Sequence, residues 1–257
     1  HDINYLALSG LASYSGRQET GPVLSATQIA DIAGGSHHAV MAILAAVVER
    51  TNTGKGQYLD ISMSDAALAL NTMFGANALA SNKDPDYGTE MLNGGLFYDY
   101  YKTADGRYLS IGSLEPNFAI PLMKHLSLDH FIPKLVNQNL EIQSSIKQAI
   151  SEKIAAKDFS FWCQEFEGLD VCVEGVLTIN EAVKHPHFLE RNMLCHSIDE
   201  DGQEIQQINS ALPFKQKTMP ASGRKLGADS HEVLKSLSYT SEEIDALFKS
   251  GCAMQKK

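Results

Sequence analysis

The sequence predicts a mixed fold of the α/β or α+β class, and three stretches support this. Residues 36–50 carry apolar side chains at the 3.6-residue spacing of an amphipathic helix and stop before a glycine-containing turn. Residues 57–63 alternate polar and apolar side chains, as a half-buried strand does. Residues 97–103 and 107–111 predict two strands joined by a short Asp-Gly turn, and therefore a hairpin.

The remaining elements follow from the same kinds of pattern. An apolar, alanine-rich helix is predicted at residues 66–79, and the polar stretch 81–86 predicts a boundary between structural units. The chain then predicts three helices, a strand and a helical turn, at residues 116–126, 139–156, 158–167, 171–176 and 180–183. A second hairpin and two short helices follow, at residues 195–198, 204–208, 230–237 and 241–248, with the last helix capped by Thr240 or Ser241.

The composition is that of an ordinary soluble globular protein. The 257 residues are 44% apolar and 20% charged, with a formal net charge of −10. This acidity argues against nucleic acid as a partner, and an anionic ligand such as coenzyme A would need local basic residues. No stretch approaches the ~18 apolar residues of a membrane span, so we expect no membrane partner. The 4 cysteines are scattered, which predicts free thiols in a reducing, cytoplasmic setting.

Asp31 precedes Gly34, Gly35 and the predicted helix at 36–50. At a helix N-terminus, backbone N–H groups point outward and the dipole favours negative charge, so Asp31 suits a capping role. It equally suits a functional role. Two adjacent glycines let a bulky ligand approach the backbone, and the nearby N–H groups could hold a developing oxyanion.

His1 and Glu115 are the other two candidates for acid/base chemistry. A histidine near a chain end is often an ordinary surface residue, and Glu115, just before Pro116, suits the first turn of a helix. A histidine and a carboxylate on separate loops can also work on opposite faces of one carbon. That arrangement would invert a stereocentre through a planar intermediate.

We expect no metal site and no phosphate-binding loop. The nine histidines are not clustered, and the adjacent pair His37-His38 would face different sides of a helix. The run Gly54-Lys55-Gly56 lies between a predicted helix and a predicted strand, whereas a phosphate loop needs a strand before it and a helix after it. It therefore predicts a turn.

Several stretches together resemble the type III coenzyme A transferase family, and within it the α-methylacyl-CoA racemases. The matching stretches are His1-Asp2-Ile3-Asn4-Tyr5 through Gly10, Ala30-Asp31 with Gly34-Gly35, Gly54-Lys55-Gly56-Gln57 into Asp60-Ile61-Ser62-Met63, Met91-Leu92-Asn93-Gly94-Gly95, Tyr98 to Tyr101, Asp105-Gly106-Arg107-Tyr108, Leu114-Glu115-Pro116-Asn117-Phe118 and His185-Pro186-His187. The resemblance covers essentially the whole chain.

The resemblance implies roles for these residues. Asp31 matches an aspartate that attacks the thioester in the transferases and works as an acid/base in the racemases. His1 and Glu115 match the racemases' other two catalytic residues, with Glu115 orienting His1. Since transferases usually carry a different residue in place of His1, the resemblance favours a racemase, and a transferase or an inert pseudo-enzyme are the alternatives. It further implies substrate or CoA binding by Asp2, Tyr5, Gly34 and Gly35, and no cofactor apart from the CoA of the substrate.

The resemblance also implies the architecture and the partners. The family has a Rossmann-like α/β large domain with an inserted, smaller α+β domain, and two subunits interlock as a homodimer. By analogy, residues 1–84 belong to the large domain and its linker, 85–190 to the small domain and 191–257 to the return of the large domain. Because the chain has no initial Met, we expect it to be the C-terminal two-thirds of a longer protein. We expect the large domain to be incomplete here.

Overall fold

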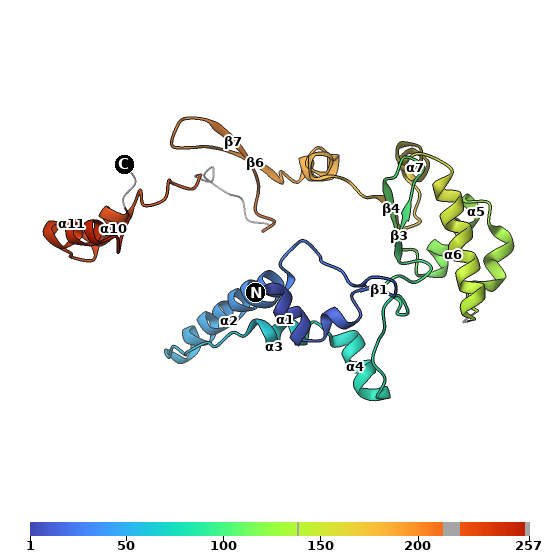
Figure 1. Ribbon diagram of the computed structural model, residues 1–257, viewed down its shortest axis with the longest axis horizontal. Coiled ribbons are helices and arrows are strands. Elements are labelled where there is room, and N and C mark those ends of the chain that lie inside the picture. Colours follow the sequence, from blue (N-terminus) through green and yellow to red (C-terminus); the bar gives the residue numbers. More distant parts are fainter. Residues whose placement is uncertain (138, 213–221, 255–257) are drawn as a thin grey trace. The chain divides into compact units, whose positions relative to one another are not determined.

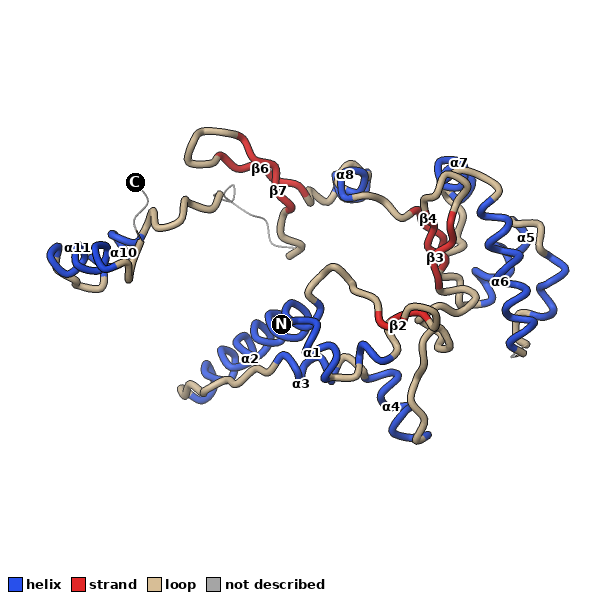
Figure 2. The backbone as a smooth tube through the Cα atoms, viewed as in Figure 1, coloured by secondary structure: helices blue, strands red, loops and turns tan. Residues whose placement is uncertain are grey.

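The computed structural model describes residues 1–137, 139–212 and 222–254 (Figure 1). Contacts along the backbone separate the chain into two compact units, His1–Val176 and Leu177–Lys257. Helices and small antiparallel sheets occur in both units, so the predicted mixed class is confirmed (Figure 2). The three-part division implied by the family resemblance stays a prediction.

The first unit begins with helices and ends with a sheet covered by helices. Its elements are α1 (Asp2–Leu8), η1 (Leu11–Ser13), β1 (Gly16–Arg17), β2 (Gly21–Pro22), η2 (Ile29–Ser36), α2 (His37–Thr53), α3 (Met63–Ala69), α4 (Thr72–Ser81), β3 (Asp99–Lys102), β4 (Tyr108–Ile111), α5 (Pro116–His125), η3 (Asp129–Lys134), α6 (Leu140–Ala155), α7 (Phe159–Phe166) and β5 (Val173–Gly175). The predicted helix at 36–50 corresponds to α2. Gly54, in the left-handed conformation, ends it as expected.

Two predictions in the N-terminal part are wrong. Residues 57–62 alternate in polarity but form no strand, because no other strand of the described chain pairs with them, and Ser62 then caps α3. The helix predicted at 66–79 is two helices, α3 and α4, separated at Leu70 and Asn71. Asn71 Nδ2 donates to the carbonyl of Ser9 at 3.0 Å and to two carbonyls of α3, so its side chain ties this break to α1.

The central sheet of the first unit has the order β3-β4-β5, with both pairs antiparallel. The predicted hairpin is confirmed, with Asp99 opposite Ile111 and Lys102 opposite Tyr108. On β3 the side chains alternate, since Tyr101 is buried whereas Tyr100 is exposed. The strand predicted at 171–176 is β5, which pairs with β4 along its free edge.

The core lies between this sheet and helices α5, α6 and α7, which correspond to the three predicted helices (Figure 1). On α6, Ile146, Ile150 and Ile154 recur every four residues and are 0% exposed. Trp162 of α7 packs into the same core, and its Nε1–H donates to the carbonyl of Ile154 at 2.8 Å. The core thus anchors the sheet whose first strand carries Tyr98, Asp99 and Tyr100 toward the site.

The second unit contains α8 (Ile179–Ala182), α9 (Pro186–Glu190), β6 (Leu194–Ile198), β7 (Glu204–Ile208), α10 (Ser230–Ser236) and α11 (Ser241–Ser250). Strands β6 and β7 pair as the predicted hairpin. Thr240 caps α11 in a capping box with Glu243, which confirms one of the two predicted caps.

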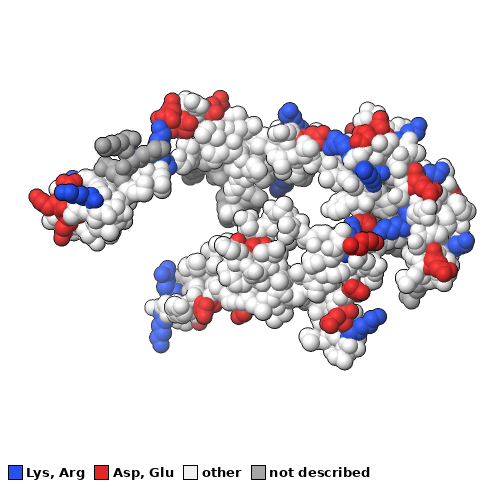
Figure 3. Space-filling view, in the orientation of Figure 1, with Lys and Arg blue, Asp and Glu red and all other residues white. Residues whose placement is uncertain are grey.

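Helix α2 exposes most of its apolar side chains within the first unit. Its large aliphatic residues are between 40% and 63% exposed, and the surface over α2 is mostly uncharged in the view of Figure 3. Because η2 runs into α2 without a break, residues 29–53 form one helix of 25 residues, and an 18-residue window within it has a mean hydropathy of 1.4. This corrects the expectation that no stretch approaches a membrane span. One such helix is weak evidence for a membrane, since core helices of soluble proteins have the same length and composition.

Candidate active site

Asp2 links the start of α1 to the start of η2, which carries Asp31. Asp2 opens α1, and its Oδ1 accepts hydrogen bonds from the backbone N–H groups of Ala30 at 2.6 Å and Asp31 at 3.1 Å. The N-terminus of α1 therefore meets the first turn of η2. His1 is the exposed N-terminal capping residue of α1 and directly precedes Asp2. The structure thus connects the backbone of His1 to that of Asp31 through Asp2, and a contact between the two side chains stays a prediction.

Tyr5 lies one turn further along α1. Its side chain is half-buried, and its backbone N–H donates to the carbonyl of His1 at 3.4 Å. Residues four apart lie on the same side of a helix, so Tyr5 and His1 share one side of α1. Substrate binding by Tyr5 stays a prediction.

Gly34 and Gly35 are closely approached by α3. A Cβ atom on Gly35 would lie 2.9 Å from Met63 Cγ, and one on Gly34 would lie 3.3 Å from the Met63 carbonyl oxygen. Side chains at positions 34 and 35 would therefore crowd Met63. In this structure the two glycines allow η2 to pack tightly on α3. The predicted contact of these glycines with substrate stays a prediction.

Segment η2, for which no element was predicted from the sequence, is a π-helix that continues into α2. Backbone N–H groups at the start of η2 already have partners. Those of Ala30 and Asp31 donate to Asp2, and that of Ile32 donates to the carbonyl of Gln28 at 3.0 Å. The N–H of Asp31 is thus already engaged. It is not free to act as the oxyanion donor considered above.

Glu115 lies at a different place in the first unit. It precedes α5, where Pro116 takes the first helical position as predicted, and its side chain is exposed. Its negative charge reaches Cys172, whose pKa is raised by burial first, then by Asp170 and Glu115. No hydrogen bond or ion pair within the described residues joins Glu115 to His1 or Asp31. The predicted contact between Glu115 and His1 is therefore not made within this chain.

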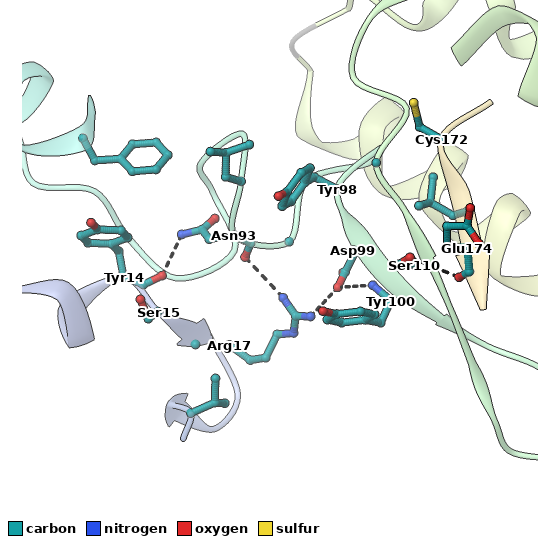
Figure 4. Close-up of a pocket in the computed structure, with 17 residues that line it drawn as sticks. Tyr14, Ser15, Arg17, Asn93, Tyr98, Asp99, Tyr100, Ser110, Cys172 and Glu174 are labelled. Atoms are coloured by element: carbon teal, nitrogen blue, oxygen red, sulfur yellow. Dashed lines mark hydrogen bonds and ion pairs between the residues drawn. The ribbon is translucent and has the colours of Figure 1, made fainter. Parts of the chain in front are cut away.

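A cavity of about 710 Å³ lies between β1, the segment 92–100, and the strands β4 and β5 (Figure 4). Its wall is mainly aromatic and aliphatic, with Tyr14, Tyr98 and Tyr100 among the lining residues. Burial raises the pKa of Tyr14, whose hydroxyl donates to Asn71 Oδ1 at 2.7 Å. Apolar cavities of this size suit small organic ligands.

Asp99 forms an ionic cluster at the edge of this cavity. Its side chain is 8% exposed and contacts both the Arg17 guanidinium and Lys147 Nζ, the latter at 2.6 Å. The two cations also bond to backbone, with Arg17 donating to the Asn93 carbonyl at 3.3 Å and Lys147 to the Gly94 carbonyl at 2.6 Å. The cluster fastens β1 and the segment 93–94 to β3 and α6.

The cavity residues were not predicted as a group from the sequence. The run Tyr98 to Tyr101 contains three tyrosines, and on a strand alternate side chains share one face. This signal could have placed Tyr98 and Tyr100 together, opposite the buried Tyr101. The contribution of Arg17 comes from a segment 82 residues earlier than Asp99, which no local pattern indicates.

The described residues contain no group of three or more His, Cys, Asp or Glu side chains placed to hold a metal ion. The side chains predicted for the site are those of one histidine and two acids. Groups of these types can transfer protons, and a carboxylate can also attack a thioester as a nucleophile.

Comparison with known proteins gives the family context for this geometry. The profile of CoA-transferase family III matches residues 1–230. The α-methylacyl-CoA racemase of Homo sapiens is 35% identical over 248 residues, covering 95% of this chain and 64% of the racemase. The succinyl-CoA:glutarate CoA-transferase of Mus musculus is 26% identical over 264 residues, covering 99% of this chain and 60% of the transferase. The chain thus spans less than two thirds of the length of these relatives.

Solved structures support the same fold. The crystal structure of a CaiB/BaiF family protein from Brucella suis superposes with a TM-score of 0.71 at 20% identity, covering 92% of this chain and 62% of that protein. At this identity the likeness concerns the fold alone.

Proposed function

Because the chain belongs to CoA-transferase family III, we propose that it acts on acyl-CoA thioesters and interconverts the (R) and (S) forms of a 2-methylacyl-CoA. His1 and Asp31 are the two acid/base groups in this proposal. No cofactor takes part, and coenzyme A is a portion of the substrate. The reaction would belong to the metabolism of branched fatty acids or related lipids.

One observation carries the proposal. The carboxylate of Asp2 binds the backbone of Asp31 while Asp2 is covalently joined to His1. The backbone of His1 is therefore connected through Asp2 to the backbone of Asp31, which resembles the family's catalytic aspartate. A second acid/base group is what a racemase needs beyond a transferase. The 35% identity to the human racemase over 95% of the chain points the same way.

The proposed reaction proceeds through an enolate. The thioester acidifies the hydrogen at C2, and one group of the pair removes it as a proton from one face, leaving its electron pair in the enolate. The other group, protonated beforehand, delivers a proton to the opposite face as the carbonyl re-forms. The pair ends with its proton on the other member, so reaction in the reverse direction restores the starting state. The enolate oxygen requires a hydrogen-bond donor other than the N–H of Asp31.

The test uses the full-length protein and a single enantiomer of a 2-methylacyl-CoA in D₂O without any second acid. We expect deuterium to enter C2 together with loss of optical purity. His1→Ala should lower the racemisation rate by about 10²–10⁴-fold, the usual contribution of one acid/base group. The matched control is His231→Ala, which changes an exposed histidine of α10 in the second unit and should leave the rate unchanged. Wild-type turnover by the His1 variant would refute the assignment.

A second candidate is a CoA transferase with Asp31 as nucleophile, favoured by the 26% identity to the mouse transferase. In that reaction the Asp31 carboxylate would attack the thioester carbonyl and expel the CoA thiolate, forming an acyl anhydride with the enzyme. Hydroxylamine would trap that intermediate, and CoA would move to an added acceptor acid. CoA transfer without deuterium entry at C2 would replace the racemase proposal with this one.

An inert pseudo-enzyme is the non-catalytic alternative. It predicts that the full-length protein fails to bind CoA in a calorimetric titration.

We further propose that the protein is a cytoplasmic homodimer with interlocked subunits, as the family resemblance implies. A dimer would let Glu115 of one subunit approach His1 of the other, which a crosslink between cysteines placed at these two positions would detect.

A further inference from the structure

The carboxylate of Asp2 takes the place of a helix cap for η2. A helix leaves the N–H groups of its first turn without partners inside the helix, and a side chain at the N-cap usually accepts from them. The N-cap residue of η2 is Gln28, and its side chain makes no such bond. Asp2, which lies 28 residues before Ala30, accepts from Ala30 at 2.6 Å and from Asp31 at 3.1 Å with the same oxygen. The cap of η2 therefore comes from α1.

This contact fixes His1 relative to Asp31. The Cα atoms of neighbouring residues lie about 3.8 Å apart, so His1 cannot move far without moving Asp2. Asp2 in turn bonds to the backbone of Asp31 itself. The two proposed acid/base residues are thus linked by one covalent step and one hydrogen bond.

The far end of α1 is held independently. The carbonyl of Ser9 accepts from Asn71 Nδ2 at 3.0 Å, and Asn71 Oδ1 accepts from the Tyr14 hydroxyl at 2.7 Å. These groups are buried. Loss of the Asp2 contact would therefore release only the end of α1 that carries His1. The helix would stay docked at its other end.

We propose that Asp2 is a positioning residue that holds His1 and Asp31 on opposite faces of the substrate carbon. This inference rests on the proposed racemase function, and it assigns to Asp2 a role different from the substrate or CoA binding implied by the family resemblance. Asp2 carries no proton in this scheme, and its Oδ1 accepts from the two backbone N–H groups. One proton passes from C2 to the base and a second passes from the acid to C2, while Asp2 sets the separation of these two groups.

The test compares two outcomes of one reaction in D₂O. Starting from one enantiomer, deuterium recovered in that enantiomer measures exchange with retention, which needs one base. Deuterium in the opposite enantiomer measures inversion, which needs both groups in place. A misplacement of about 1 Å can cost about 10²-fold in rate, so Asp2→Ala should lower the ratio of inversion to retention by about 10–100-fold.

Two further substitutions separate position from charge. Asp2→Asn keeps an oxygen that can accept both N–H bonds, so its ratio should stay within about 3-fold of wild type. Asp2→Glu keeps the charge but moves the carboxylate outward by one methylene, so its ratio should fall even though the variant folds. These two variants decide the question if Asp2→Ala does not fold.

Asn139→Ala is the matched control for the loss of a cap. Asn139 caps α6 with one side-chain oxygen that accepts from Glu141 N at 2.9 Å and Ile142 N at 3.2 Å, as Asp2 does for η2. It should lower thermal stability as Asp2→Ala does and leave the ratio of inversion to retention unchanged. An unchanged ratio in Asp2→Ala, or a ratio in Asp2→Asn as low as in Asp2→Ala, would overturn the positioning role while the wild-type racemase activity stands. Absence of both exchange and inversion in wild type would instead overturn the proposed function and this inference with it.

Discussion

Replacing Asp99 with Asn tests whether the ionic cluster holds the N-terminal segment to the central sheet. Asp99 is 8% exposed at its side chain, and it accepts from Lys147 at 2.6 Å, from its neighbour Tyr100 N at 2.8 Å and from Arg17. Asparagine has nearly the same shape but no charge. The substitution therefore removes the charge while disturbing the packing little.

The expected loss follows from the two cation contacts. A hydrogen bond to a charged group contributes about 1.5–3 kcal/mol. The side chains of Arg17 and Lys147 are 39% and 38% exposed, so water can solvate them again after the change and the lower end of that range applies. We expect the free energy of unfolding to fall by about 2–4 kcal/mol, which for a chain of this size corresponds to about 5–12 °C in melting temperature.

The assay is urea unfolding of the full-length protein, followed by circular dichroism and repeated by thermal melting. Asp84→Asn is the matched control, because Asp84 is an exposed acid in a coil of the same unit, and its stability should stay within about 0.5 kcal/mol of wild type. An Asp99→Asn variant as stable as this control would refute the reasoning. It would show that the cluster contributes no more than an exposed ion pair.

Two further predictions concern the sheet and its edge. Hydrogen bonds from the Thr103 hydroxyl and then from backbone N–H groups hold the pKa of Asp105 below its ordinary value of 3.8, so the folded state binds this proton more weakly than the unfolded state. The stability gained from this carboxylate is complete above about pH 4 and is lost as the pH falls through the lowered pKa. In denaturant titrations from pH 6 to 2.5, the free energy of unfolding of Asp105→Asn should therefore fall less with acid than that of wild type. Parallel curves would contradict this. Gly175→Ala should cost about 1–3 kcal/mol in the free energy of unfolding, because the new Cβ would lie 2.6 Å from Phe159 Cζ and 2.9 Å from Cys163 Sγ. The control is Gly56→Ala, because a Cβ at position 56 would meet no atom within 4 Å. Equal melting temperatures for Gly175→Ala and Gly56→Ala would count against the packing argument.

Local patterns in the sequence predicted those elements whose stability depends on neighbours close in the chain. The stripe of isoleucines on α6, the Asp-Gly turn between β3 and β4 and the Thr240 cap of α11 all belong to this kind. The strand predicted at 57–63 failed because alternation indicates a strand only where a partner is present. The break at Asn71 was missed because it depends on Ser9, 62 residues away.

The candidate site shows the same limit. The catalytic roles of His1 and Asp31 were predicted from the family resemblance. Nothing in the local sequence indicates that Asp2 bonds to the backbone of Asp31. Gly34 and Gly35 predicted a close approach of a ligand, which stays a prediction, and the structure shows instead a close approach from within the chain. The approaching group is Met63 of α3, which a pattern of adjacent residues cannot identify.

The unbroken helix from Ile29 to Thr53 gives Asp31 a mechanical connection to a distant surface. Its α-helical part, α2, has 17 residues and is therefore roughly 25 Å long at about 1.5 Å of rise per residue. Asp31 lies in the first turn of η2, which continues into α2. A helix transmits a tilt along its length because each turn is hydrogen-bonded to the next. A group that packs on the exposed aliphatic side of α2 and tilts this helix would therefore also move Asp31, the proposed catalytic aspartate. We expect substitutions of the exposed Val48 to alter turnover by changing the angle of this helix, although Val48 lies 17 residues beyond Asp31 along the chain.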